Sequence, residues 1–102
     1  MILKINKKKF IYLISPNKIT TDFYQNLEKV LKTGKVSFFQ MRLKKYTANQ
    51  KILIGKKMKK ICKKNNVKFL VNDDPILANR LNADGCHLGQ KDTDINEARK
   101  IV

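Results

Sequence analysis

The chain has 102 residues, enough for one small domain with a modest core but too few for a large enzyme architecture. Its hydrophobic fraction of 42% is ordinary for a globular protein, and every apolar run is shorter than the roughly 18 residues of a membrane span. The N-terminus lacks the apolar core and cleavage pattern of a signal peptide, so we expect a cytoplasmic protein with no membrane association.

The net charge of +15 is the most unusual bulk property of the chain. Such an excess of lysine suits nucleic acid, acidic membranes or phosphorylated small molecules as partners. The lysines are scattered among many Asn and Ile, however, which is also the composition of proteins from AT-rich genomes. A basic nucleic-acid-binding module is therefore an alternative of a different class, disfavoured because the sequence has no readable nucleic-acid motif.

The first half of the chain predicts two strand-helix units. Residues 9–15, KFIYLIS, form an aromatic and β-branched run that predicts a buried strand. A helix with one apolar stripe is expected from about Thr21 to Thr33. Residues 36–42, VSFFQMR, predict a second strand, and Thr47 with Gln50 forms a capping box that begins the second helix.

The second half of the chain repeats this pattern twice. Residues 67–72, VKFLVN, predict a third strand, after which Asp74-Pro75 supplies the cap and first-turn proline of a short helix. The segment 85–88, GCHL, predicts a fourth strand, and Asp94 with Glu97 is expected to begin a last helix. Four such units with short connections imply an α/β fold of parallel strands joined by right-handed crossovers.

Polar side chains follow the apolar part of the second strand. Because side chains alternate along a strand, Gln40, Arg42 and, if the extended chain persists, Lys44 are expected on one side. An amide, a guanidinium and an ammonium at this spacing suit a multiply charged phosphate, because Arg offers a planar fork and Lys a mobile point charge.

Acidic side chains follow the third and fourth strands. Asn72 and Asp73 end the third strand and Asp92 follows the fourth, so the two carboxylates are expected to meet at one edge of a parallel sheet. With phosphate oxygens and water they form the ligand set that Mg²⁺ prefers. The structural alternative is helix capping by both acids. His87 is either a base or, as is commoner, a hydrogen-bonded strand residue.

Three segments, QMRLKKYT, VNDDPILANRLNADG and CHLGQKD, resemble motifs of the thiamine phosphate synthase family and its TenI-like relatives, in the same order along the chain. The combination of H-x-G-Q-x-D after A-D-G with an upstream N-D and Q-x-R-x-K is much more specific than any one piece. The sequence departs from the family pattern at Leu43, Asp74 and Lys91, and none of these is a proposed metal ligand.

The resemblance implies a TIM-barrel transferase of thiamine biosynthesis, which joins hydroxymethylpyrimidine diphosphate to a thiazole phosphate and releases pyrophosphate. It implies Mg²⁺ as cofactor, held by Asp73 and Asp92, and assigns no residue as catalytic. The residues expected to bind the diphosphate are Gln40, Arg42, Lys44 and Asn72. His87 and Gln90 are expected near the mouth of the substrate site.

A TIM barrel has eight strands in about 250 residues, whereas this chain supplies four strand-helix units. We therefore expect residues 1–102 to form the N-terminal half of the barrel, with open sheet edges. A truncated synthase is the first interpretation, a homodimer of two halves the second, and a non-catalytic remnant the third. We expect little synthase activity from the isolated chain. A TenI-like thiazole tautomerase, which needs no diphosphate or metal ligands, is the alternative enzyme.

Overall fold

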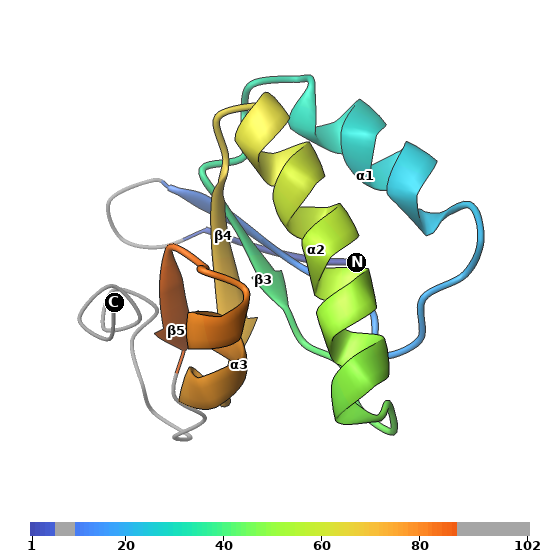
Figure 1. Ribbon diagram of the computed structural model, residues 1–102. Helices are drawn as coiled ribbons and strands as arrows, with labels where there is room; N and C mark the ends of the chain where they lie inside the picture. The colour runs from blue at the N-terminus through green and yellow to red at the C-terminus, as the bar shows by residue number, and fades with distance from the viewer. Residues whose placement is uncertain (6–9, 88–102) are drawn as a thin grey trace.

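The computed structural model describes residues 1–5 and 10–87 of the chain. In this part, five strands form one sheet in the order β1-β2-β3-β4-β5. The strands are β1 (Ile2–Ile5), β2 (Ile11–Ile14), β3 (Phe38–Met41), β4 (Lys68–Asn72) and β5 (Gly85–His87). The helices are α1 (Phe23–Leu31), α2 (Ala48–Lys64) and α3 (Pro75–Arg80), and each connects two neighbouring strands (Figure 1).

Strands β2 to β5 are the four parallel strands expected from the sequence, in chain order. The helix expected from Thr21 to Thr33 is α1, which is two residues shorter at each end. The last predicted helix, from Asp94, lies outside the described residues. The α/β fold class and the repeated strand-helix order are therefore confirmed for the part of the chain that the structure describes.

Strand β1 was not predicted. It pairs antiparallel with β2 along its whole length, from Ile2 opposite Ile14 to Ile5 opposite Ile11, so the sheet is mixed rather than wholly parallel. Four residues with one lysine are too short a run to indicate a strand without knowledge of the neighbour that pairs with it. The edge of β2 that we expected to be open is occupied by β1.

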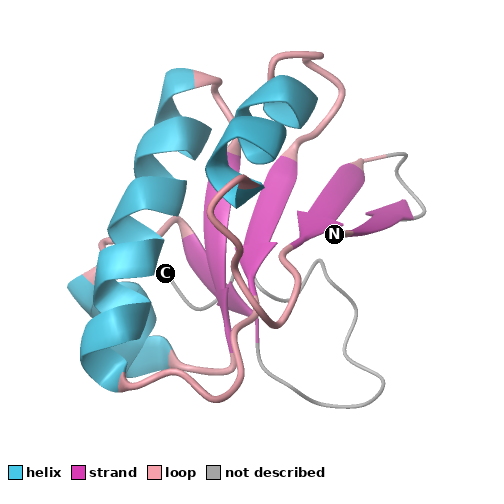
Figure 2. Cartoon of the chain, turned by 90° about the vertical axis from the view of Figure 1, so that its right-hand side faces the viewer, coloured by secondary structure: helices cyan, strands magenta, loops and turns pink. Residues whose placement is uncertain are grey.

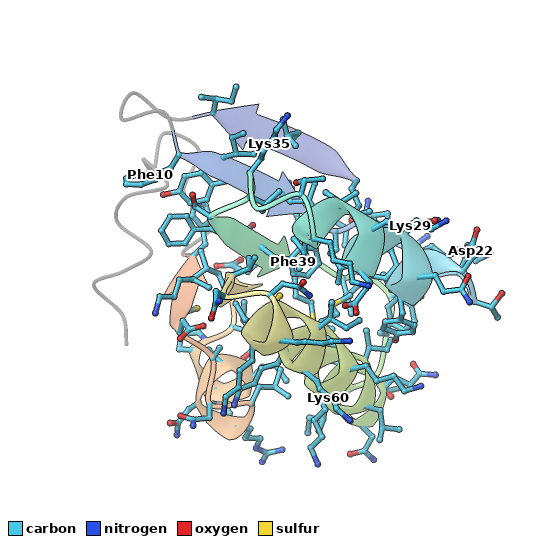
Figure 3. All side chains as sticks on the ribbon, turned by 90° about the horizontal axis from the view of Figure 1, so that it is seen from above. Phe10, Asp22, Lys29, Lys35, Phe39 and Lys60 are labelled. Atoms are coloured by element: carbon cyan, nitrogen blue, oxygen red, sulfur yellow. The ribbon has the colours of Figure 1, made fainter. Side chains whose placement is uncertain are left out.

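All three helices lie on one face of the sheet (Figure 2). Because side chains alternate along each strand, Leu13, Phe39 and Phe69 point toward these helices and belong to the main core. Phe39 has no exposed surface, and Figure 3 shows it between β3 and the helices. Burial of a side chain of this size contributes about 1.5–3 kcal/mol to the free energy of unfolding. The helices contribute buried residues at helical spacing: Phe23, Leu27, Leu31, Met58, Cys62 and Leu77.

The opposite face of the sheet carries a smaller aromatic cluster near the amino ends of the strands. Tyr12 and Phe38 stack with ring centroids 4.5 Å apart, and Phe10 meets Phe38 edge-on at 6.0 Å. Leu70 completes this cluster from β4. In a closed barrel, this face of the strands is the barrel interior, which layers of side chains fill.

Helices α2 and α3 begin with the caps that the sequence predicts. The Thr47 hydroxyl accepts from the Gln50 N–H at 3.1 Å, and the Gln50 side chain accepts from the Thr47 N–H at 2.9 Å, which confirms the capping box of α2. Asp74 accepts from the Leu77 N–H at 3.0 Å, ahead of Pro75 at the first position of α3. These contacts satisfy backbone donors that a helix leaves unpaired at its start.

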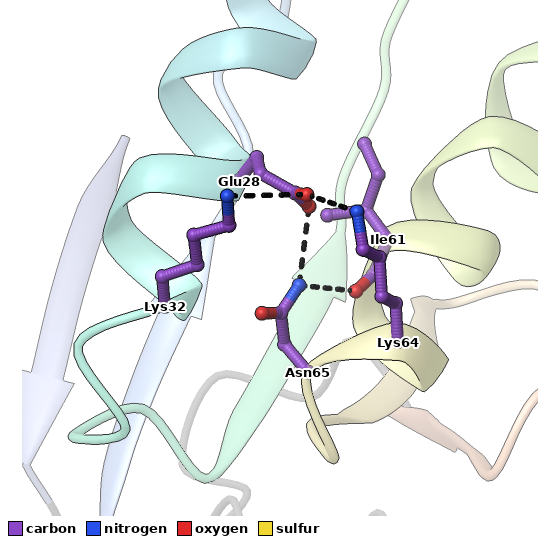
Figure 4. Close-up of polar contacts among 5 residues, drawn as sticks. All are labelled: Glu28, Lys32, Ile61, Lys64 and Asn65. Carbon is purple, nitrogen blue, oxygen red and sulfur yellow. Dashed lines mark hydrogen bonds and ion pairs between the residues drawn. The ribbon is translucent and has the colours of Figure 1, made fainter.

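A polar cluster joins α1 to the end of α2 (Figure 4). One carboxylate oxygen of Glu28 accepts from Lys64 Nζ at 2.8 Å, and the other accepts from Asn65 Nδ2 at 3.1 Å. Lys32, the C-cap residue of α1, has its Nζ 3.9 Å from Oε1 of Glu28. The hydrogen bond from Lys64 is the main reason why the pKa of Glu28 is lowered. The cluster therefore links α1 to the residues at the end of α2.

Most lysines of the helices are exposed. Lys29 and Lys60 point away from the sheet in Figure 3, and Lys57 lies over the Tyr24 ring, with Nζ 5.3 Å from its centroid. Helix α2 has 17 residues, many of them lysine. Among the described residues, no helix combines the length and the apolar character that crossing a membrane requires.

We predict that Gly55→Ala destabilises the chain by about 1–3 kcal/mol, because an added Cβ would overlap Cδ1 of the buried Leu81. In a helix interior without such a neighbour, the same change would be stabilising by about 1 kcal/mol. The free energy of unfolding, measured in urea, checks this. In a chain that already carries Leu81→Ala, Gly55→Ala is expected to cause no further loss of unfolding free energy. If the two losses simply add, residues 55 and 81 are not in contact as described.

Candidate functional site

Predicted site residues lie in one row across the carboxyl-terminal ends of β3, β4 and β5. Met41 is paired with Val71, so the next residues along these two strands, Arg42 and Asn72, lie at one level. Asn72 is directly opposite His87 of β5. Neighbouring strands are about 4.8 Å apart, so this row spans about 10 Å. The sheet therefore brings a guanidinium, an amide and an imidazole to one edge.

Gln40 lies one layer below this row, on the face opposite the main core. It is level with Ile14 of β2 and Leu70 of β4, and only 3% of its surface is exposed. A buried amide between two apolar side chains is uncommon, since a buried polar group without hydrogen bonds is costly. Gln40 thus marks the level at which the apolar interior gives way to the polar edge.

Ser15 fixes the backbone of Arg42. Its hydroxyl accepts from the Arg42 N–H at 2.8 Å and donates to the Arg42 carbonyl at 3.3 Å, and its own N–H donates to the Gln40 carbonyl at 2.9 Å. Ser15 is only 2% exposed. The end of β2 therefore sets the position from which the half-buried Arg42 side chain leaves the sheet.

Lys44 lies beyond the strand rather than on it. β3 ends at Met41, and Leu43 still packs on the main core, so side chains continue to alternate for two residues past the strand. Lys44 is exposed, and the chain turns at Lys45, which has a φ of 63°. The loop that follows is tied to the loop after β2, because the Tyr46 hydroxyl accepts from the Ile19 N–H at 2.9 Å.

Asp73 follows β4 directly and is exposed. Its N–H donates to the His87 carbonyl, so the β4–β5 ladder extends to this residue. Its φ of 57° lies in the left-handed region, where Asp is tolerated better than most residues. Capping was the alternative role, but α3 is capped by Asp74, so Asp73 does not have it.

The described part of the chain supplies one of the two proposed magnesium ligands. A carboxylate at the edge of the sheet, directly after Asn72 in the chain, offers the hard oxygen donors that Mg²⁺ binds, so Asp73 fits the chemistry of this ion. Asp92 and Gln90 lie outside the described residues, and the predicted meeting of Asp73 with Asp92 stays a prediction. Within residues 1–5 and 10–87, no three His, Cys, Asp or Glu side chains form a metal-binding group.

The two cysteines have no place in this site. Cys62 and Cys86 are both buried in the main core and both are free thiols. Burial raises the pKa of Cys62 to about 12, and it also raises the pKa of Cys86. A thiol that stays protonated in an apolar core is a poor nucleophile and a poor metal ligand.

A basic cavity lies at the other end of the sheet. It has a volume of about 360 Å³ and is lined by lysines beside the start of β4, among them Lys59, Lys63 and Lys68. Asp84 is also in its wall, where its carboxylate accepts from the Phe69 N–H at 2.8 Å. Asn82 and Asp84 in its wall belong to the VNDDPILANRLNADG segment, but none of Gln40, Arg42, Lys44, Asn72, Asp73 and His87 lines the cavity, so the candidate site stays at the carboxyl-terminal edge.

Sequence reasoning missed Ser15 and Tyr46 as parts of the site. Ser15 was interpreted only as the last residue of the first predicted strand, and Tyr46 only as part of the QMRLKKYT motif, with no role of its own. A small polar residue directly after a buried strand is a usable signal for Ser15, because loops at that end of a parallel sheet carry function. Nothing in the local sequence indicates that Tyr46 reaches Ile19 across 27 residues.

Comparisons with known proteins find relatives along most of the chain. The family model for thiamine monophosphate synthase matches residues 11–102. A thiamine-phosphate synthase from Pelagibacter ubique is 66% identical over 100 residues, which are 97% of this chain and 48% of that protein. One from Erythrobacter litoralis is 41% identical over 92 residues, 88% of this chain and 43% of that protein.

A solved structure shares the fold. The thiamine phosphate pyrophosphorylase from Pyrococcus furiosus superimposes with a TM-score of 0.68 at 26% identity, over 89% of this chain and 44% of that one. The chain thus spans about half the length of the relatives it matches, as expected for half of a TIM-barrel-type fold. The resemblance found in the motifs is confirmed, and the chain belongs to the thiamine monophosphate synthase family.

Proposed function

We propose that residues 1–102 are the N-terminal half of a thiamine phosphate synthase and supply its diphosphate-binding edge. The observation that carries the proposal is the row of Arg42, Asn72 and His87 at the carboxyl ends of adjacent parallel strands. Those residues belong to the family's motifs, and active sites of TIM barrels lie at this end. In this proposal, Gln40, Arg42, Lys44 and Asn72 bind the diphosphate of hydroxymethylpyrimidine diphosphate.

The proposed reaction couples this substrate to a thiazole phosphate and releases pyrophosphate. As the bond to the diphosphate breaks, negative charge grows on the departing oxygens and positive charge on the pyrimidine methylene, which the thiazole nitrogen then attacks. Arg42 and Lys44 would stabilise the departing diphosphate, and Asn72 would orient it by hydrogen bonds. Such a site acts by positioning and electrostatics, so it needs no nucleophile from the protein.

Mg²⁺ is the proposed cofactor, with Asp73 and Asp92 as its protein ligands. Bound there, the ion would neutralise charge on the diphosphate oxygens. The exposed position of Asp73 at the row supports this role. A TenI-like tautomerase would need neither Arg42 nor these acids, so their presence favours the synthase.

The proposed partner is the second half of the barrel, since the relatives are about twice as long as this chain. A homodimer is the less favoured assembly, because it would duplicate the first four strands without adding the loops that follow the missing ones. We propose the cytoplasm as compartment, where the two buried thiols stay reduced. The lysines are scattered along the chain and the sequence has no readable nucleic-acid motif, so we propose neither a nucleic acid nor a membrane as partner.

We predict that Mg²⁺ strengthens binding of hydroxymethylpyrimidine diphosphate to the chain, and that Asp73→Asn abolishes this strengthening. The amide keeps the size of the side chain but lacks the charge that holds the ion. Calorimetric titration with and without Mg²⁺ checks the prediction. Asp84→Asn is the matched control at the opposite end of the sheet. A response to Mg²⁺ that Asp73→Asn leaves unchanged would exclude Asp73 as a ligand.

We predict that Arg42→Ala weakens this binding about tenfold or more, since hydrogen bonds to charged groups contribute about 1.5–3 kcal/mol. Ser15→Ala is expected to weaken it less, because that change keeps the guanidinium and loses only the two contacts that fix the Arg42 backbone. The combined variant should bind like Arg42→Ala alone. Lys35→Ala, which removes one positive charge before β3, is the control and should bind normally. Full additivity of Ser15→Ala and Arg42→Ala would show that Ser15 does not act through Arg42.

We predict that the isolated chain releases pyrophosphate from the two substrates no faster than a blank without protein. The loops that would hold the thiazole phosphate belong to strands beyond these four. A chimera, made by joining the second half of the Pelagibacter ubique synthase after residue 102, is expected to restore release that depends on both substrates. Multiple turnovers by the isolated chain would contradict the proposed division of the site.

A further inference from the structure

Strand β2 has no free edge. It pairs with β3 on one side over Tyr12–Ile14 and with β1 on the other side over Ile11–Ile14. A strand in a sheet has two hydrogen-bonding edges, and closure of an eight-stranded barrel requires one edge of the first barrel strand for the last strand. β2 is the first of the parallel strands, so β1 occupies the edge at which a barrel would close.

β1 also runs in the opposite direction to a barrel strand at this edge of β2. β1 runs antiparallel to β2, whereas the barrel strands of this fold are all parallel. β1 and the closing strand would have to use the same N–H and C=O groups of β2. The two arrangements therefore exclude each other.

β1 is weakly held. All four of its residues are exposed, and the apolar side chains of Ile2, Leu3 and Ile5 keep 52%, 53% and 65% of their surface accessible. It thus contributes mainly backbone pairing and little apolar burial, and strands of this kind are the ones that open first. The main core includes Leu13 of β2, and Ile11 of β2 packs against it, but no residue of β1 belongs to either group.

We propose that β1 is an exchangeable strand, which pairs with β2 in the half barrel and leaves it when the last strand of the second half takes the same edge. This inference rests on the proposed half-barrel architecture and adds to it a defined exchange of strands. While it is bound to β2, β1 blocks pairing of that edge with other chains, which is the usual hazard of an open strand. The occupant of the edge after exchange is a parallel strand from the second half, not a second copy of β1.

Amide hydrogen exchange in the isolated chain and in the chimera with the second half of the Pelagibacter ubique synthase tests this. The amides of Ile2–Ile5 that pair with β2 are expected to be protected in the isolated chain and to lose protection in the chimera, while β2 stays protected in both. Protection of β1 that is equal in the two proteins would overturn the proposal. A chimera that does not unfold cooperatively would also contradict the proposal. The proposal requires that the last strand of the second half pairs with β2 and closes the barrel.

A disulfide lock gives a second measurement. Ile5 and Ile11 are directly opposite each other, at a Cα separation that is about 4.5–5.5 Å in antiparallel pairs and suits a disulfide. In the chimera that carries both Ile5→Cys and Ile11→Cys, oxidation is expected to lower the unfolding temperature, and a reductant should restore it. The reduced form of the same protein and the single Ile5→Cys variant are the controls. An oxidised chimera that is as stable as the reduced one would overturn the exchange.

Pyrophosphate release separates this inference from the proposed function. If the chimera is active and the amides of β1 stay protected, the proposed strand exchange is wrong, but the proposed synthase function still holds. If β1 is released and the chimera is folded but inactive, the exchange holds and the proposed function fails.

Discussion

The parallel pairing of β2 to β5 is the constraint on which the site depends. Parallel strands in chain order must all end at one edge, so residues that are 30 positions apart in sequence, such as Arg42 and Asn72, come to lie side by side. The helices are needed for the same reason, because each return of the chain crosses one face of the sheet and buries Phe39 and Phe69 beneath it. The parallel order of β2 to β5 therefore determines both the packing of the core and the position of the site residues.

Local signals in the sequence predicted much of this arrangement. The Thr47–Gln50 capping box and the Asp74-Pro75 helix start depend on neighbouring residues alone, and both were correct. The edge position of Arg42 and Asn72 followed from strand alternation and the rule that parallel strands end together. The roles of these residues in binding phosphate, and that of Asp73 in binding a metal, stay predictions, since position alone does not identify a ligand.

What the sequence did not predict depends on contacts between distant segments. β1 is defined by its pairing with β2, and its own four residues resemble many surface segments. The contact of Ser15 with Arg42 spans 27 residues and needs the registry of β2 with β3, which no local pattern encodes. The place of Lys44 was predicted only on the condition that the strand continued, but β3 ended at Met41 and the chain turned at Lys45.

Gln40 sits directly above the stacked rings of Tyr12 and Phe38, on the same face of the sheet. The faces of these rings carry no N–H or O–H donor, whereas the Gln40 amide and the side chains above it do. On this face of the sheet, an apolar layer therefore borders a polar layer. The boundary lies at the level of Gln40. In the proposed function, the diphosphate would bind at the level of Arg42 and Asn72, above Gln40, because Gln40 is the one polar residue of β3 and the aromatic cluster lies below it.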